Sequence, residues 1–434
     1  MSELRPHIKA NEKHHLTIGG VDAVALADEF GTPLYVTDEN RVRERYREFR
    51  DAFSSLYPKV EVRYAYKANT GLAVLHILKQ EGAGADIVSA GELYIALKVG
   101  LKPEQIIFTG NNKSDNELEM ALNAGVTINI DAVHELERLR RTCEEVKKSA
   151  RISFRINPAV SPGTHPHLST GLRESKFGIP AEEALDAYKL ALDSAYLKIS
   201  GLHMHIGSQI TSTSPYEEAT EKLLEIAGKL KEIGIELDFV DVGGGLGIRY
   251  EEKQSFVTPK QLAEALTPLI KSKIKEYGLK ELELYLEPGR YIVGDASITL
   301  ARVSTIKKTP YRKFIGVDAG FHVLSRPLLY DGYHEVVVAN KINEKNIEKV
   351  HIAGNLCESG DILAKDRTLP NAEKDDILAF MDTGAYCMVM SSQYNSRPRP
   401  AEVLVKDDEY ELIRERENFE DIFEKQRIPE RLLK

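Results

Sequence analysis

One repeating pattern constrains the fold of this chain more than any other feature: short strand-like runs alternate with helical segments from Val60 to Arg290. Eight runs are predicted to be strands, at 60–67, 85–89, 106–109, 127–130, 152–157, 201–206, 239–242 and 284–287. Helical patterns separate most of them, for example at 115–123, 134–148, 181–195, 216–233 and 259–277. Eight strands that alternate with helices predict a TIM-like (β/α)8 barrel.

A doubly wound open sheet is the alternative fold. Such a sheet would carry a glycine-rich turn after its first strand. In this chain the glycine-rich turn, Gly243-Gly244-Gly245, follows the seventh predicted strand. We therefore prefer the barrel.

The alternation of strands and helices ends near residue 302. Beyond it, predicted strands follow one another without long helices between them, at 313–317, 335–339, 349–353, 377–382 and 401–405. The residues Lys406-Asp407-Asp408-Glu409 predict a hairpin turn between 401–405 and 410–413. The extended segment Pro33-Leu34-Tyr35-Val36 is expected to add a strand to this region. We therefore divide the chain into a barrel over residues 37–302 and an all-β domain, a sandwich or small barrel, formed by residues 1–36 and 303–434.

Charge and composition exclude several classes of function. A net charge of −9 argues against nucleic acid and anionic membrane surfaces as main partners. The three cysteines are too few and too scattered for a disulfide framework or a zinc cluster, and they suit a reducing compartment. The N-terminus has no apolar signal core, and no stretch approaches the roughly 18 apolar residues of a membrane span. We expect a cytoplasmic protein.

The first strand of the predicted barrel ends at Lys67, and a helical pattern begins near Thr70. A lysine at the C-terminal mouth of a strand, facing a cavity, loses part of its charge by desolvation and can form a Schiff base with an aldehyde. The alternative interpretation is a surface lysine that ends a strand. The other motifs decide between the two.

Strand seven is followed by Gly243-Gly244-Gly245-Leu246-Gly247, in the region where such barrels commonly bind phosphate. Consecutive glycines let the backbone approach an anion and point N–H groups at it, although a flexible turn has the same composition. Strand eight ends in Glu287-Pro288-Gly289-Arg290. This segment places a carboxylate and a guanidinium beside the glycine turn.

Strand six ends in His203-Met204-His205-Ile206-Gly207-Ser208. Two histidines at i and i+2 point to the same side of a strand, which raises the alternative of a metal site. No third ligand follows with suitable spacing, so we predict no metal. An imidazole stacked on an aromatic cofactor fits the pattern better.

Together these segments describe a site for a phosphorylated, electrophilic, aromatic cofactor. The glycines and Ser208 would bind its phosphate, and Lys67 its aldehyde. His205 would lie on one face of the ring. Glu287 would pair with a pyridine nitrogen and keep it protonated, which makes the ring an electron sink. These are the properties of pyridoxal phosphate.

Five motifs in this order resemble those of the alanine-racemase-like (fold type III) pyridoxal-phosphate decarboxylases. They are Tyr64-Ala65-Tyr66-Lys67-Ala68-Asn69, His203-Met204-His205-Ile206-Gly207-Ser208, Gly243-Gly244-Gly245-Leu246-Gly247, Glu287-Pro288-Gly289-Arg290 and Cys357-Glu358-Ser359. Within that group the chain is similar, over nearly its whole length, to the diaminopimelate decarboxylase family.

The resemblance implies a role for each matching residue. Lys67 would be the Schiff-base lysine and Cys357 the proton donor. The cofactor would be bound by Lys67 together with His205, Ser208, Gly243, Gly244, Gly245, Glu287, Gly289, Arg290 and Tyr386. The substrate would be bound by Arg290, Arg326, Tyr330, Glu358 and Tyr386. The resemblance also implies a homodimer, in which the Cys357-Glu358 loop reaches into the partner's barrel mouth.

The residues support the substrate that the resemblance implies. Meso-2,6-diaminopimelate carries an ammonium and a carboxylate at the end that does not react, so its site needs an anion and a cation. Arg326 and Glu358 supply that pair, and loss of CO₂ from the other end gives L-lysine. The alternatives are a decarboxylase for ornithine, arginine or a carboxynorspermidine-type amino acid, a racemase, and a non-catalytic pyridoxal-phosphate carrier. Retention of Lys67, Glu287 and Cys357 together argues against the carrier.

Overall fold

The computed structural model describes residues 5–161, 163 and 170–433. These residues form two compact units. One comprises Val42–Arg249 and Lys253–Gly294. The other comprises the residues up to Arg41, Tyr250–Glu252 and the residues from Asp295 onward.

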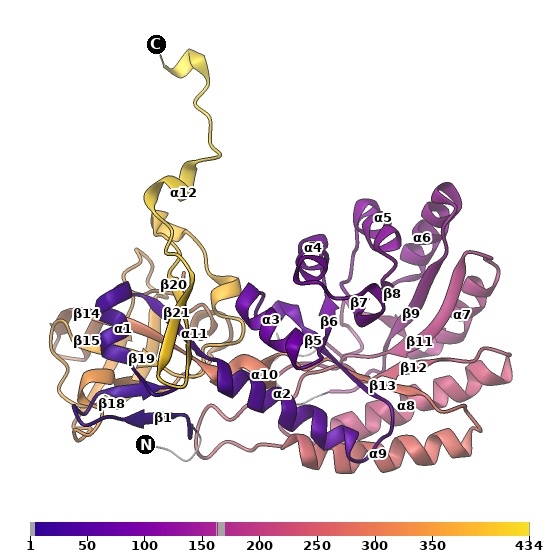
Figure 1. The fold of residues 1–434 in the computed structure, drawn as a ribbon, viewed down its shortest axis with the longest axis horizontal. Coiled ribbons are helices and arrows are strands. Elements are labelled where there is room, and N and C mark those ends of the chain that lie inside the picture. The colour runs from indigo at the N-terminus through magenta and orange to yellow at the C-terminus, as the bar shows by residue number, and fades with distance from the viewer. Residues whose placement is uncertain (1–4, 162, 164–169, 434) are drawn as a thin grey trace. The chain divides into compact units, whose positions relative to one another are not determined.

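The first unit is a closed barrel of parallel strands (Figure 1). The ring runs through β5 (Val60–Ala65), β6 (Gly84–Ile87), β7 (Ile106–Phe108), β8 (Thr127–Ile130), β9 (Ala150–Asn157), β11 (Leu197–His203), β12 (Phe239–Asp241) and β13 (Glu283–Leu286). Pairing of β13 with β5, at Leu284 opposite Val60, closes the ring. The short β10 (Ile179–Pro180) pairs in parallel with the C-terminal end of β9. The closed ring confirms the predicted (β/α)8 barrel and excludes an open sheet.

Helices follow the barrel strands along the chain. They are α2 (Glu39–Ser54), which precedes β5, and α3 (Leu72–Gln80), α4 (Ala90–Val99), α5 (Asp115–Ala124), α6 (Val133–Val146), α7 (Ala184–Leu192), α8 (Ser214–Glu232), α9 (Pro259–Glu276) and α10 (Arg290–Val293). Local sequence sets several of their ends. Ser114 and Glu117 form a capping box at the start of α5, and Gly125 ends that helix in a left-handed conformation.

The second unit is built on a sheet that joins both ends of the chain. Its strand order is β18 (Ile362–Leu369), β17 (Glu348–Ala353), β15 (Lys313–Val317), β14 (Ser297–Lys308), β4 (Leu34–Asp38), β20 (Ala401–Lys406) and β21 (Glu409–Arg414). β19 (Ile377–Phe380) pairs with β14 and with β16 (Val336–Val338). The predicted strand at 33–36 is therefore confirmed as β4, between β14 and β20.

Alternation along these strands gives the sheet two apolar faces. Leu34 and Leu300 lie in one buried cluster, whereas Tyr35 and Ala301 lie in the other. The smaller sheet of β1 (Ile8–Ala10), β2 (Leu16–Ile18) and β3 (Val21–Asp22), with α1 (Ala23–Phe30), contributes to the first of these clusters. The unit also carries α11 (Arg326–Tyr330) and α12 (Phe419–Phe423). In the part of the chain that the structure describes, no helix is both long and apolar enough to cross a membrane.

Candidate active site

Lys67 lies where the sequence places it, directly after the first barrel strand. β5 ends at Ala65, and Lys67 is the middle residue of a 3-10 turn, Tyr66–Ala68. Its Nζ donates to Oδ2 of Asp86 at 2.9 Å, and its side chain remains 34% exposed. The amine is therefore oriented by a carboxylate and still accessible to a ligand.

Asp86, in β6, was missed by the sequence analysis. Its side chain is fully buried, and its second oxygen accepts a hydrogen bond from the Thr109 hydroxyl. Burial and the nearby Glu287 raise the pKa of Asp86, and Lys67 opposes the shift. An acidic residue inside an otherwise apolar strand was the signal that could have identified it.

Glu287 follows β13 and is held by a chain of buried hydrogen bonds. His203 Nε2 lies 3.2 Å from Glu287 Oε2, and His203 Nδ1 lies 3.0 Å from the amide nitrogen of Asn129. The Ser153 hydroxyl donates to the Asn129 carbonyl at 2.7 Å, which orients the amide. Because the amide nitrogen is a donor, His203 Nδ1 must accept, and Nε2 carries the proton that is donated to Glu287.

This chain of contacts keeps Glu287 ionised. Burial raises the pKa of Glu287, but His203 and Lys67 outweigh that effect and lower the pKa to about 2. Oε1 of Glu287 is buried and has no hydrogen-bond partner among the residues that the structure describes. A buried, ionised carboxylate oxygen without a donor suits a protonated ring nitrogen of a ligand.

Asp241, at the end of β12, is the second carboxyl group of this cluster. Its Oδ1 accepts from the N–H of Gly243 at 2.8 Å. Burial and Glu287 raise the pKa of Asp241 well above its ordinary value. His203, Asp241 and Glu287 together have the spacing of a metal site, with ligand atoms within 4.8 Å of one another. Of these three residues only His203 and Glu287 share a hydrogen bond, and Asp241 Oδ2 is buried without a hydrogen-bond partner among the residues that the structure describes. The absence of a metal stays a prediction.

His205 lies beyond the end of β11, so it does not share a strand face with His203 as the sequence suggested. Its Nδ1 accepts from the N–H of Gly244 at 3.2 Å, which fixes the orientation of the ring. Burial and the charges of Lys67 and Arg155 lower the pKa of His205 well below its ordinary value. A neutral imidazole in a fixed orientation suits contact with the face of an aromatic ring.

The glycine turn has a more specific role than the sequence suggests. Gly243 and Gly245 have positive φ, at +73° and +100°, and a Cβ on Gly244 would collide with the carbonyl oxygen of Glu287. The N–H groups of Gly243 and Gly244 donate to Asp241 and His205. Of the three glycines, Gly245 alone keeps an N–H without a partner among the described residues.

Hydrogen-bond donors suited to an anion adjoin Gly245. A Cβ on Gly245 would collide with the carbonyl oxygen of Gly207, so the Gly207-Ser208 loop lies directly against it. Gly289 immediately precedes α10, whose first residue is the buried Arg290. Arg290 Nη2 donates to the Ser208 hydroxyl at 3.1 Å. A guanidinium, a hydroxyl and a backbone N–H are donors suited to a phosphate.

The barrel thus brings Lys67, His205, Ser208, Gly245, Glu287 and Arg290 into one site. These residues fit a phosphorylated pyridine aldehyde. The Glu287 oxygen without a partner among the described residues matches the ring nitrogen, the anion donors match the phosphate, and the Lys67 amine matches the aldehyde. Five further predicted site residues belong to the second unit: Arg326, Tyr330, Cys357, Glu358 and Tyr386.

In the second unit, Arg326 begins α11 and is buried, and Tyr330 ends the same helix half-buried. The Cys357-Glu358 loop is exposed. Its conformation is set by Asp361, whose carboxylate accepts from the N–H groups of Leu356 at 2.8 Å and Phe321 at 2.7 Å. Tyr386 has a positive φ of 58°.

Comparison with known proteins identifies the class. Residues 39–294 match the family model described as the pyridoxal-binding domain of pyridoxal-dependent decarboxylases. The chain belongs to this family of pyridoxal-dependent decarboxylases, as the five motifs predicted.

Several of its relatives are diaminopimelate decarboxylases. The diaminopimelate decarboxylase of Methanothermobacter thermautotrophicus is 51% identical over 430 residues, which cover 99% of each chain. That of Archaeoglobus fulgidus is 46% identical over 418 residues, 96% of this chain and 98% of the relative. The crystal structure of diaminopimelate decarboxylase from M. jannaschii in complex with L-lysine superposes with a TM-score of 0.93 at 41% identity, covering 99% of each chain.

Proposed function

We propose that this chain decarboxylates meso-2,6-diaminopimelate to L-lysine with pyridoxal phosphate as its cofactor. One structural observation carries the chemistry: the buried, ionised Glu287 presents an oxygen that has no hydrogen-bond partner among the described residues, and the charge of Lys67 helps to keep this carboxyl group ionised. Pyridoxal phosphate, when bound, supplies a protonated ring that accepts the electron pair left behind by CO₂. The substrate follows from the full-length similarity to diaminopimelate decarboxylases, one of which binds L-lysine.

The barrel residues hold and tune the cofactor. Arg290, Ser208 and the Gly245 N–H bind the phosphate, and His205 contacts one ring face. Lys67 provides the amine for the aldehyde, and Asp86 orients that amine. Glu287 keeps the ring nitrogen protonated, because the hydrogen bond from His203 stabilises the carboxylate. Gly243 and Gly244 act indirectly, by holding Asp241 and His205. Gly289 lies directly before Arg290 at the start of α10.

The second unit supplies the groups that act on the substrate. Cys357 returns a proton to the α-carbon after CO₂ has left. Arg326 binds the distal carboxylate and Glu358 the distal ammonium, with Tyr330 and Tyr386 as further contacts. This pair discriminates against ornithine and arginine, because neither carries a distal carboxylate for the guanidinium.

The active enzyme is a homodimer in the cytoplasm. Cys357 and Glu358 are exposed on the isolated chain, beside the exposed Leu328, which lies against Gly360. Reactive side chains on an exposed loop support a site completed by a second copy. Mixing inactive Lys67→Ala chains with inactive Cys357→Ala chains should restore part of the activity. If subunits exchange and no activity returns, Cys357 serves the site of its own chain.

The function is tested by measuring CO₂ release from meso-diaminopimelate, ornithine and arginine with the holoenzyme. We expect release from diaminopimelate and little from the other two. Arg326→Ala should greatly raise the KM for diaminopimelate and leave the absorbance of the bound cofactor unchanged. Faster release from ornithine or arginine would instead identify a decarboxylase for a related basic amino acid.

A further inference from the structure

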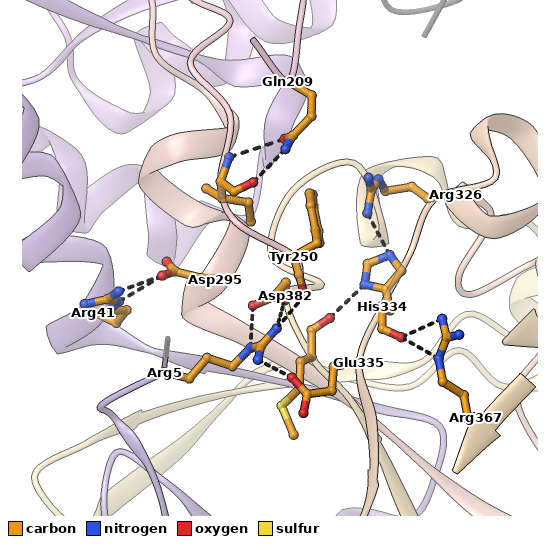
Figure 2. Close-up of polar contacts among 12 residues, drawn as sticks. Arg5, Arg41, Gln209, Tyr250, Asp295, Arg326, His334, Glu335, Arg367 and Asp382 are labelled. Carbon is orange, nitrogen blue, oxygen red and sulfur yellow. Dashed lines mark hydrogen bonds and ion pairs between the residues drawn. The ribbon is translucent and has the colours of Figure 1, made fainter. Parts of the chain in front are cut away.

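Arg326 is a buried cation with an incomplete set of partners. Its side chain is 4% exposed, and it forms no ion pair with any carboxylate of the described residues. Nη1 lies 2.7 Å from Nε2 of His334, whereas Nε is buried without a hydrogen-bond partner among the described residues. The guanidinium lies over the ring of Tyr250 at 4.5 Å (Figure 2). A buried guanidinium without a counter-ion favours an anionic ligand.

His334 is held in one tautomer by its surroundings. The ring is fully buried, and Nδ1 lies 2.7 Å from the carbonyl oxygen of Met381. A carbonyl only accepts, so Nδ1 carries the proton. Nε2 must then accept from Arg326, which never loses its own proton. The imidazole is therefore neutral, and its acceptor nitrogen faces Arg326.

The imidazole is also fixed in position. Its own backbone carbonyl accepts from Nε and Nη2 of Arg367, at 3.4 and 3.2 Å (Figure 2). The ring packs edge-on against Tyr250, with centroids 5.7 Å apart. The carbonyl of Met381 precedes Asp382, which accepts from Arg5 Nε at 2.9 Å. These contacts leave the imidazole little freedom to turn away from Arg326.

We propose that His334 is the positioning residue for substrate specificity: by accepting from Nη1, it aims the Nε–Nη2 edge of Arg326 at the distal carboxylate of the substrate. That edge presents two parallel N–H groups, the geometry that binds a carboxylate through both oxygens. The inference rests on the proposed role of Arg326 and adds the residue that orients it. His334 itself does not contact the substrate.

Two variants separate orientation from simple packing. In His334→Gln, the amide reaches the position of Nε2 and still offers an oxygen to Arg326. In His334→Asn, the shorter amide reaches only the position of Nδ1, so it can serve Met381 and leaves Arg326 without its acceptor. His334→Asn should raise the KM for diaminopimelate about tenfold with little change in kcat, as expected for one lost hydrogen bond to a charged group. His334→Gln should stay within about threefold of the unchanged enzyme.

Two inhibitors show which part of the ligand is affected. L-Lysine keeps the distal carboxylate, whereas 1,5-diaminopentane has none. His334→Asn should weaken inhibition by L-lysine about tenfold and leave inhibition by the diamine unchanged. The inference is overturned if inhibition by L-lysine is the same in His334→Asn as in the unchanged enzyme. It is also overturned if inhibition by L-lysine and inhibition by the diamine are weakened equally in both variants, because that result indicates a general packing role for His334.

The test distinguishes this inference from the function on which it rests. If Arg326→Ala leaves the KM for diaminopimelate and the inhibition by L-lysine unchanged, the proposed distal site is wrong. If Arg326→Ala raises the KM for diaminopimelate and weakens inhibition by L-lysine, but His334→Asn changes neither quantity, the inference about His334 is wrong and the proposed function stands. In Arg326→Ala, adding His334→Asn should have no further effect, because the two residues act as a unit.

The protonation state of His334 can be measured in the unchanged enzyme, without a substitution that destabilises the fold. Nitrogen-15 NMR of histidine-labelled holoenzyme, with the His334 signals assigned from their loss in His334→Gln, should show a neutral ring protonated on Nδ1. A proton on Nε2, or a doubly protonated ring, would overturn the inference even if His334→Asn does not fold.

Discussion

Replacing Glu287 with glutamine changes the charge of the buried cluster while keeping its shape. The amide oxygen can accept from His203 Nε2, which now lies 3.2 Å from Glu287 Oε2. The amide nitrogen then takes the place of Oε1, the atom without a partner among the described residues. This nitrogen is a donor, whereas Oε1 is an acceptor. The proposed ring nitrogen therefore loses the carboxylate that keeps it protonated.

The size of the effect follows from the electrostatics of the cluster. Burial raises the pKa of Glu287, yet His203 and Lys67 lower it to about 2 from an ordinary 4.5. A pKa difference of that size stabilises the ionised form of Glu287, relative to its protonated form, by on the order of 3 kcal/mol. Loss of one preorganised electrostatic group from an active site typically lowers turnover by about 10²–10³-fold. We expect kcat of Glu287→Gln to fall within that range.

Asp241→Asn is the matched control, because Asp241 is a buried carboxyl group of the same cluster. Burial and Glu287 raise the pKa of Asp241 well above its ordinary value, which opposes ionisation of this carboxyl group, whereas the pKa of Glu287 is lowered. A neutral amide at this position therefore removes less negative charge from the cluster than Glu287→Gln does, and its oxygen still accepts from the Gly243 N–H. We expect kcat to stay within about tenfold of the unchanged enzyme.

The assay combines initial rates of CO₂ release with denaturant unfolding at two pH values. A depressed pKa in the folded state means that ionised Glu287 stabilises the fold above about pH 4.5, and that this contribution is lost as the pH falls toward 2. Between pH 6 and pH 3, the unchanged chain should lose about 2 kcal/mol more stability than Glu287→Gln. Equal rate losses in Glu287→Gln and Asp241→Asn, or a larger loss in Asp241→Asn, would refute the assignment of the charge to Glu287.

Three further predictions concern other parts of the molecule. Lys67→Ala should abolish decarboxylation, and borohydride treatment of the unchanged holoenzyme followed by peptide mapping should label Lys67 and no other lysine. Asn129→Leu removes the donor to His203 and the acceptor for Ser153, so denaturant unfolding should show a free energy of unfolding lowered by about 2–4 kcal/mol. A decrease below about 1 kcal/mol would contradict the proposed chain of hydrogen bonds. Arg326→Lys keeps the charge but loses the planar fork, and steady-state kinetics should show the KM for diaminopimelate raised more than kcat is lowered.

Local periodicity was sufficient to predict the barrel. Each predicted barrel strand overlaps one strand of the closed ring, because strands and helices differ in the spacing of their apolar residues. In the second unit, the sequence analysis missed β1, β2, β3, β14 and β18. β14 carries polar and charged residues along its second half, which hide the alternation. It is stabilised as a strand by pairing with β4, β15 and β19.

The barrel topology also explains why the residues of the cofactor site were predictable. Parallel strands of a barrel all end at one mouth, so polar residues at the ends of strands one, six, seven and eight are brought together by the fold itself. Lys67, His205, Ser208 and Glu287 were found in this way. Their roles as cofactor ligands remain predictions for the experiments above.

The sequence by itself determined the fold class and the residue types gathered at the barrel mouth, since both depend on local pattern and on where strands end. Only the tertiary structure decided the protonation and orientation of those residues. Asn129 gives no sign in the sequence that it selects the tautomer of His203, and His334 gives none that it orients Arg326. Such roles depend on distances between segments far apart in the chain, because a hydrogen bond requires its donor and acceptor to approach within about 3 Å.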